Sequence, residues 1–205
     1  KNSKKMIEVE IRGPLTDTKK QELLPLLLAK PGAVHRTQHR IFIDYSGSPV
    51  GRTKDVRIRT TDGVSEIMIK LGAYGAEDQR QEFGVKVGEH KFDECVGVMH
   101  ALGYDEGFLC EWSSDIVTVD GIEFVLKSTK DFPEWGLIEA DIEVQTEAEI
   151  PAARSALKNL FAENCIQAHT DDSFAEYVVG LEREVFPKFK YAEYTPGYFA
   201  KTFGI

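Results

Sequence analysis

Several segments of the sequence place charged residues at every second position between aliphatic ones, which is the spacing of one face of a β-strand. The acidic members of this pattern are Glu8, Glu10, Glu139, Asp141 and Glu143. Carboxylate oxygens are the ligands that Mg²⁺ and Mn²⁺ prefer in proteins. Two groups of carboxylates, each on one strand face, therefore predict a divalent-metal site.

Basic residues follow the same alternation in the middle of the sequence. Arg57 and Arg59 are two positions apart, and Lys70 lies opposite an Ile-Ile-Leu face. Lys86 and Arg12 are further members of the pattern. Arginine offers paired N–H groups to phosphate oxygens, and lysine offers a point charge. A metal site together with basic residues is typical of phosphoryl transfer, so these residues predict the binding of a polyphosphate.

The charged faces of these strands have two interpretations. For one strand alone, the ordinary one is better: the apolar face packs inside and the charged face meets solvent. Applied to all five strands, it leaves like charges two positions apart with nothing to offset their repulsion. A closed sheet offers the second interpretation, because helices then cover the apolar outer face and the charges point into a polar lumen.

The elements that would position these residues form an α+β pattern. Apolar–polar alternation predicts strands at residues 6–13, 40–45, 55–61, 64–71, 80–87, 107–112, 116–119, 122–127 and 138–145. Asp-Gly pairs predict two-residue hairpin turns at positions 62–63 and 120–121. Apolar spacing and end signals predict helices at residues 16–30, 91–102, 147–164 and 171–186. We therefore predict an antiparallel closed β-barrel of about eight strands that forms a charged tunnel, with helices packed outside.

Composition narrows the class of protein. Hydrophobic residues make up 42% of the 205 residues and charged residues 29%, which indicates a folded chain. The net charge of -9 argues against general nucleic-acid binding, and no apolar run is long enough to predict a membrane span. Three widely spaced cysteines suggest no disulfide framework, which favours a cytoplasmic location. We expect one domain at residues 1–186 and an aromatic tail at residues 187–205 that packs on it without regular structure. The aromatic residues of the tail leave open whether the chain forms a homodimer.

The ordered set of charged motifs resembles the CYTH superfamily, also called the triphosphate tunnel metalloenzymes. The run from Glu8 to Arg12 resembles the family's ExExK signature, with Arg in place of the final Lys. Further along the chain, the family's RxR, xK, RxE and ExE elements are similar to Arg57-Ile58-Arg59, Ile69-Lys70, Arg80-Gln81-Glu82 and the acids of residues 136–143. The resemblance covers nearly the whole chain.

This resemblance implies a charged barrel that acts on a triphosphate with Mg or Mn. It implies catalytic roles for Arg12 and Glu82, and adds Arg80 to the phosphate-binding residues. Two registers remain open for the late acidic strand: Glu139 with Asp141, which we favour, or Asp141 with Glu143.

Three functions remain open at this stage. The first is hydrolysis of a small triphosphate, such as inorganic tripolyphosphate, thiamine triphosphate or a nucleoside triphosphate. The second is a class IV-type adenylyl cyclase, which would use the same site with a ribose hydroxyl as nucleophile. The third is a non-catalytic module that binds polyphosphate or a phosphorylated ligand. Acids at both the first and last strands favour the hydrolase.

Overall fold

The computed structural model describes residues 7–75 and 81–205. Its strands are β1 (Ile7–Leu15), β2 (Val34–Asp44), β3 (Lys54–Thr61), β4 (Val64–Leu71), β5 (Gln81–Glu89), β6 (Glu106–Val119), β7 (Ile122–Ser128), β8 (Gly136–Val144) and β9 (Lys188–Lys190). Its α-helices are α1 (Asp17–Leu28), α2 (Phe92–Ala101), α3 (Ile150–Glu163), α4 (Asp171–Glu184) and α5 (Tyr198–Phe203). Arg80, which we expected to bind phosphate, lies outside the described residues.

The strands form one sheet in the order β1-β8-β7-β6-β2-β3-β4-β5, with β9 paired to β6. The pairings whose register is defined are antiparallel, as predicted. The prediction of a closed barrel is wrong, because this order ends at β1 and β5 and no pairing among the described residues joins them. At the β1 end, Pro14 lacks a backbone donor, which discourages further pairing at that position.

Most predicted elements are confirmed, with two informative differences. Residues 107–112 and 116–119 are not separate strands, because β6 runs unbroken from Glu106 to Val119. The tail after residue 186 is not irregular, since it forms β9 and α5. Phe189 and Phe199 of this tail are buried in a hydrophobic core, which explains why the segment is ordered.

The chain divides into two compact units. Among the described residues, unit 1 comprises residues 7–37, Gly75 and residues 113–176. Unit 2 comprises residues 38–74, 81–112 and 177–205. Strands β2 and β6 and helix α4 each contribute residues to both units.

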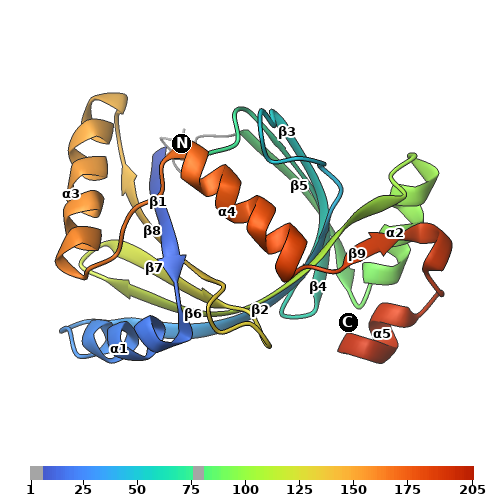
Figure 1. The fold of residues 1–205 in the computed structure, drawn as a ribbon, viewed down its shortest axis with the longest axis horizontal. Coiled ribbons are helices and arrows are strands. Elements are labelled where there is room, and N and C mark those ends of the chain that lie inside the picture. The colour runs from blue at the N-terminus through green and yellow to red at the C-terminus, as the bar shows by residue number, and fades with distance from the viewer. Residues whose placement is uncertain (1–6, 76–80) are drawn as a thin grey trace, which may run out of the picture. The chain divides into compact units, whose positions relative to one another are not determined.

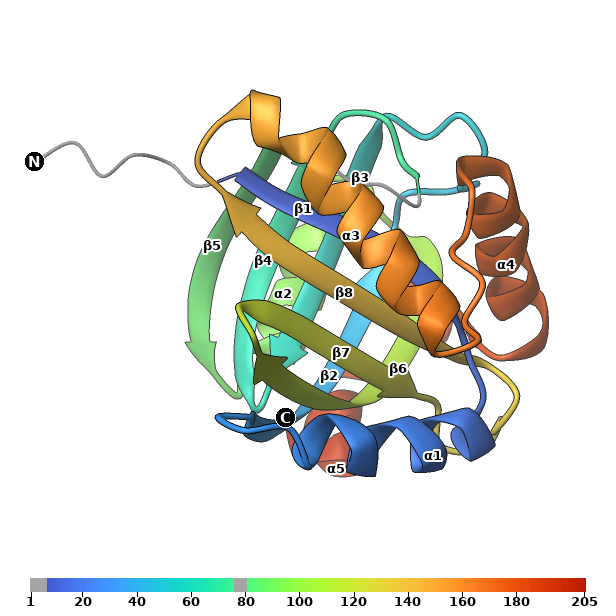
Figure 2. The ribbon, with the colours of Figure 1, turned by 90° about the vertical axis from the view of Figure 1, so that its left-hand side faces the viewer.

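In unit 1, helix α3 lies along β1 and β8 and covers their apolar face (Figure 2). Strand alternation sends Val9 and Ile11 of β1 to this face, where Leu157 and Phe161 of α3 meet them in one hydrophobic cluster. The alternate residues of β1, Glu8 and Glu10, are thereby placed on the opposite face of the sheet.

In unit 2, helix α2 packs on β3 and β4, and α5 packs on α2 (Figure 1). The buried residues Val56 and Ile58 of β3 face Phe92 and Val96 of α2 in a second hydrophobic cluster. The residues that alternate with them on β3, Arg57 among them, therefore lie on the other face. No helix among the described residues is both long and apolar enough to cross a membrane.

Candidate functional site

Unit 1 carries the predicted acidic residues on two neighbouring strands. In the register of β1 and β8, Glu8 lies opposite Glu143 and Glu10 lies opposite Asp141. Carboxylates directly opposite each other on paired strands repel, which costs free energy of folding. Such a pairing is tolerable where a cation is bound, which is the role predicted for these residues.

Arg12 is buried and holds two of these carboxylates. Its Nη2 donates to Glu10 Oε2 at 2.8 Å, and its Nε donates to Glu139 Oε1 at 3.3 Å. Its Nη1 donates to the backbone oxygen of Gly75 at 2.8 Å, and its guanidinium lies 5.2 Å from the centre of the Phe174 ring. Three directed hydrogen bonds fix this side chain, so Arg12 can hold the carboxylates of Glu10 and Glu139 in place.

Glu139 has a second cationic partner. Lys127 of β7 lies with its Nζ 2.5 Å from Glu139 Oε2. Burial alone would raise the pKa of Glu139, but Lys127 and Arg12 outweigh it and hold that pKa well below its usual range. The negative charge of Glu139 is thus largely balanced by the protein.

Asp141 has the opposite environment. Burial and the surrounding carboxylates, with Glu8 the strongest of them, raise its pKa from 3.8 to about 7. Glu123 of β7, which lies directly opposite Asp141, contributes to this rise. Among the residues of the late acidic strand, Asp141 is therefore the one whose ionised form an added cation would stabilise.

The residues of unit 1 fit a divalent cation in donor chemistry. Several carboxylates surround Asp141 and repel its negative charge. A bound cation would relieve this repulsion. In the described residues, however, no three His, Cys, Asp or Glu side chains are close enough together to form a preassembled metal site. The acids present would have to adjust their side chains to ligate a metal.

Unit 2 carries the predicted basic residues on the face of β3 and β4 that α2 does not cover. The hairpin register places Arg57 opposite Met68 and Arg59 opposite Glu66. Because side chains alternate along a strand, Arg57, Arg59 and Lys70 share one face. Their side chains are only 17 to 22% exposed, so each cation is partly desolvated.

Each of these bases has a carboxylate partner. Arg57 donates to Asp55 at 2.5 Å, and Arg59 donates to Glu66. Lys70 lies 2.9 Å from Glu82 of β5, and Arg59 lies 3.8 Å from the same carboxylate. Burial would raise the pKa of Glu82, but Lys70 and Arg59 outweigh it and lower that pKa. Glu82 is therefore ionised at neutral pH and joins two of the predicted phosphate-binding residues.

The innermost part of this network is an ion cluster around Arg52. Its Nη1 lies 2.8 Å from Asp55 and 3.0 Å from Asp44, and its Nη2 lies 3.6 Å from Glu182 of α4. Burial and Asp44 raise the pKa of Glu182 to about 7, although Arg52 opposes this rise. Asp55 is fully buried and accepts hydrogen bonds from both Arg52 and Arg57. It therefore connects Arg57 to the buried ion cluster of this unit.

Arg57 keeps hydrogen-bonding capacity beyond these ion pairs. Its Nε is buried and has no hydrogen-bond partner within residues 7–75 and 81–205. A buried N–H without an acceptor is costly, and a phosphate oxygen is a suitable acceptor. Lys86, the remaining predicted base, is exposed on β5 opposite Glu66.

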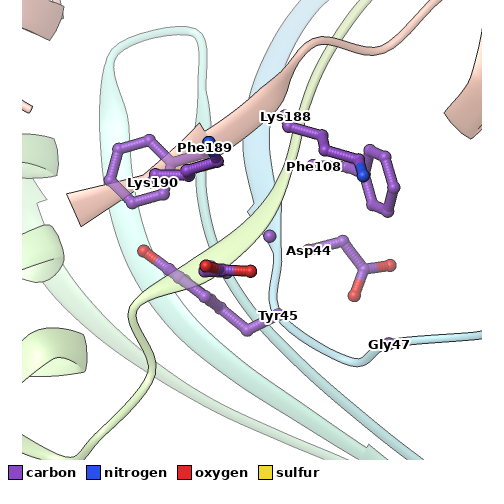
Figure 3. A pocket seen from close by; sticks show the side chains of 9 residues that line it. Asp44, Tyr45, Gly47, Phe108, Lys188, Phe189 and Lys190 are labelled. Carbon is purple, nitrogen blue, oxygen red and sulfur yellow. The ribbon is translucent and has the colours of Figure 1, made fainter. Parts of the chain in front are cut away.

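A cavity of about 220 Å³ lies in unit 2 (Figure 3). Asp44 and Tyr45 line it together with Phe108, Lys188 and Phe189. None of the predicted phosphate-binding residues lines the cavity. Its mixed acidic, basic and aromatic lining does not select one class of ligand.

Sequence reasoning missed several residues that the site depends on. Glu123 and Lys127 alternate with buried residues of β7, and the Asp120-Gly121 turn could have placed both on the face of Glu139 and Asp141. Asp55 begins a predicted strand and gave no signal of its own. Its role arises from contacts with Arg52 and Arg57, which only the folded chain brings together.

Comparison with known proteins places the fold. No sequence-family description matches the chain, and no curated protein matches it by sequence. Among solved structures, the PH1819 protein from Pyrococcus horikoshii OT3 is similar with a TM-score of 0.63 and 18% identity, over 84% of this chain and 98% of that one. A Vibrio parahaemolyticus protein provisionally named an adenylate cyclase is similar with a TM-score of 0.60 and 15% identity, over the same shares.

A third solved structure is also similar to this chain. HpAC1 from Hippeastrum, provisionally named an adenylyl cyclase and described as having a dominant triphosphatase activity, matches with a TM-score of 0.54 and 16% identity. The match covers 86% of this chain and 96% of that one. These structures share their fold with this chain.

Proposed function

We propose that this chain is a divalent-metal-dependent hydrolase of a small triphosphate. The observation that carries the proposal is the row of three partly buried cations on β3 and β4 in a chain of net charge -9. Partly desolvated cations aligned on one strand face bind a linear anion more strongly than solvated surface lysines do. The similarity to HpAC1, which is described as a triphosphatase, is in keeping with this class of substrate.

In this proposal Arg57, Arg59 and Lys70 bind phosphate oxygens, with Lys86 and Arg80 as further contacts. The carboxylates that now pair with the first three bases neutralise them in the absence of substrate. A triphosphate would compete with those carboxylates for the same N–H groups. Glu82, which joins Lys70 and Arg59, would then be released to accept a proton or orient water.

The carboxylates of unit 1 supply the cation site in the same proposal. Asp141 and Glu8 are the principal ligands, with Glu10, Glu143 and Glu139 as the remaining acids of the set. Bound Mg²⁺ or Mn²⁺ would supply positive charge and Lewis acidity at these carboxylates. Arg12 acts as a positioning residue, because it fixes the carboxylates of Glu10 and Glu139.

Two other functions use the same residues. The provisional cyclase names of similar structures keep a class IV-type adenylyl cyclase in view. A binding module without turnover is the other alternative, and one observation favours it: residues 108–112 of β6 contain no Arg or Lys, which leaves that segment without a phosphate contact. The three functions differ in the products that they release, so one assay separates them.

The test is the product formed from tripolyphosphate, thiamine triphosphate and ATP, each with Mg²⁺, Mn²⁺ or EDTA. We expect metal-dependent phosphate release, which EDTA abolishes. Cyclic nucleotide with pyrophosphate would identify a cyclase. Phosphate release no greater than that of a metal-only control, with each triphosphate intact after long incubation, would overturn the enzyme assignment.

A pair of variants ties the activity to the cation row. Arg59→Gln should weaken triphosphate binding by about 1–3 kcal/mol and lower turnover as well. Lys54→Gln is the matched control, because Lys54 lies on the same strand at a position of the opposite parity and is exposed. Equal behaviour of the two variants would show that the row does not bind the substrate.

A further inference from the structure

Strand β5 is the outer strand of the sheet in unit 2 (Figure 2). Along residues 7–75 and 81–205 its one pairing partner is β4, so its second edge presents backbone N–H and C=O groups without a strand beside it. An open edge of this kind is able to accept a further strand.

One face of β5 is apolar and exposed. Val85 is 68% exposed and Phe83 is 49% exposed, and Val87 shares this face. Their neighbours Ile69 and Leu71 on β4 are exposed as well, because α2 covers only the inner part of this face. Clustered exposed aliphatic and aromatic residues on an edge strand mark a surface for association with another chain.

The sequence of β5 is complementary to itself when two copies run antiparallel. Its central residues read Glu82-Phe83-Gly84-Val85-Lys86, with opposite charges at equal distances from Gly84. An antiparallel pairing centred on Gly84 sets Glu82 of each copy opposite Lys86 of the other. The same register sets Phe83 opposite Val85, so both the charges and the apolar residues find partners.

We propose that β5 is a dimer interface, through which two copies of this chain extend their sheets across a two-fold axis at Gly84. The contact is isologous, since each attractive pair occurs twice. A second copy is favoured over an unrelated strand because the charge pattern that complements Glu82 and Lys86 is the pattern of β5 itself. The pairing joins few residues, so the dimer should form at roughly micromolar concentration or above.

The register can be tested by charge reversal. Lys86→Glu sets two carboxylates opposite each other at both ends of the pairing, and Glu82→Lys sets two ammonium groups opposite each other there. Each single variant should dimerise about tenfold more weakly than the wild type, because two attractive pairs become repulsive. A mixture of the two variants should form heterodimers, and the double variant should recover wild-type affinity. Sedimentation equilibrium over a concentration series measures all four.

Two further variants keep the test independent of Glu82, which also pairs with Lys70. Val85→Asp should abolish the dimer, whereas Val50→Asp, at a residue that is 70% exposed in a loop of the same unit, should leave it intact. Gly84→Cys in a Cys165→Ser background should form an intermolecular disulfide, and a Cβ at Gly84 has room, with its nearest contact at 3.4 Å. A monomeric wild type, or a dimer unaffected by Val85→Asp, would overturn the proposal.

Discussion

Ionisation of Asp141 lowers the stability of the folded protein. Its pKa is raised from 3.8 to about 7 by burial and by the carboxylates around it, with Glu8 the strongest. The folded chain therefore holds the carboxyl proton of Asp141 more tightly than the unfolded chain does. As the pH rises from about 4 to about 7, ionisation of Asp141 lowers the free energy of unfolding, and the full cost is present above pH 7.

The size of this cost follows from the change in pKa. A rise of about three in the pKa of Asp141 corresponds to a free energy of about 4 kcal/mol. Asp141 is not fully buried, so solvent screening reduces the figure to about 2 kcal/mol. Asp141→Asn removes the ionisation and keeps the shape of the side chain. The variant should therefore be more stable than the wild type by about 2 kcal/mol at pH 8 and equal to it at pH 4.

Urea unfolding at pH 4, 6 and 8 without added metal measures this difference. Glu139→Gln is the matched comparison on the same strand, because Lys127 and Arg12 hold the pKa of Glu139 below its usual value. The stability that Glu139 contributes is present above pH 4.5 and is lost as the pH falls. Its removal should destabilise the protein by about 3 kcal/mol at pH 8, since Arg12 and Lys127 each lose one carboxylate partner.

Added Mn²⁺ should reverse the order of wild type and Asp141→Asn at pH 8. A cation that binds only the folded state raises its melting temperature, and the variant lacks the ligand that carries the unbalanced charge. A stability difference between Asp141→Asn and wild type that does not change between pH 4 and pH 8 would refute the reasoning, whatever the activity of the variant.

Three further predictions concern unit 2. Asp55→Asn should cost about 3 kcal/mol in urea unfolding, because this fully buried carboxylate is the partner of two arginines; a loss below about 1 kcal/mol would contradict its anchoring role. Glu182→Gln should become more stabilising as the pH rises through about 7, since burial raises the pKa of Glu182 to that value. An effect on stability that does not depend on pH would argue against a raised pKa of Glu182. Phe199→Ala should lower the free energy of unfolding by about 3–5 kcal/mol, whereas Tyr198→Ala, at a half-exposed neighbour, should cost much less; similar losses would place the tail outside the core.

The β3–β4 hairpin shows how far the sequence alone can define this site. Asp62 and Gly63 both adopt positive φ, as a two-residue turn requires, and the turn fixes the register of the strands it joins. Strict alternation then determines that Arg57, Arg59 and Lys70 share a face. These three placements depend on short-range geometry, which is why they could be predicted.

Features that depend on distant parts of the chain could not be predicted in the same way. The polar run Ser113-Ser114-Asp115 reads as a break between two strands, but pairing with β7 keeps it in the extended conformation of β6. The tail reads as irregular because β9 has only three residues, and its pairing with Glu106–Phe108 joins segments about eighty positions apart. The closed barrel failed for a related reason, since alternation defines the faces of a strand and leaves its edges undefined.

The division of the chain into two interleaved units has a consequence for its synthesis. Each unit is assembled from segments that are separated in the sequence, and the core of unit 2 includes Phe189, Phe199 and Ile205. A ribosome that has made residues 1–176 has produced β3, β4 and β5 without the aromatic residues that complete their core. We expect the exposed faces of these strands to need protection until the last segment emerges, so folding should be slow, largely post-translational and sensitive to chaperones.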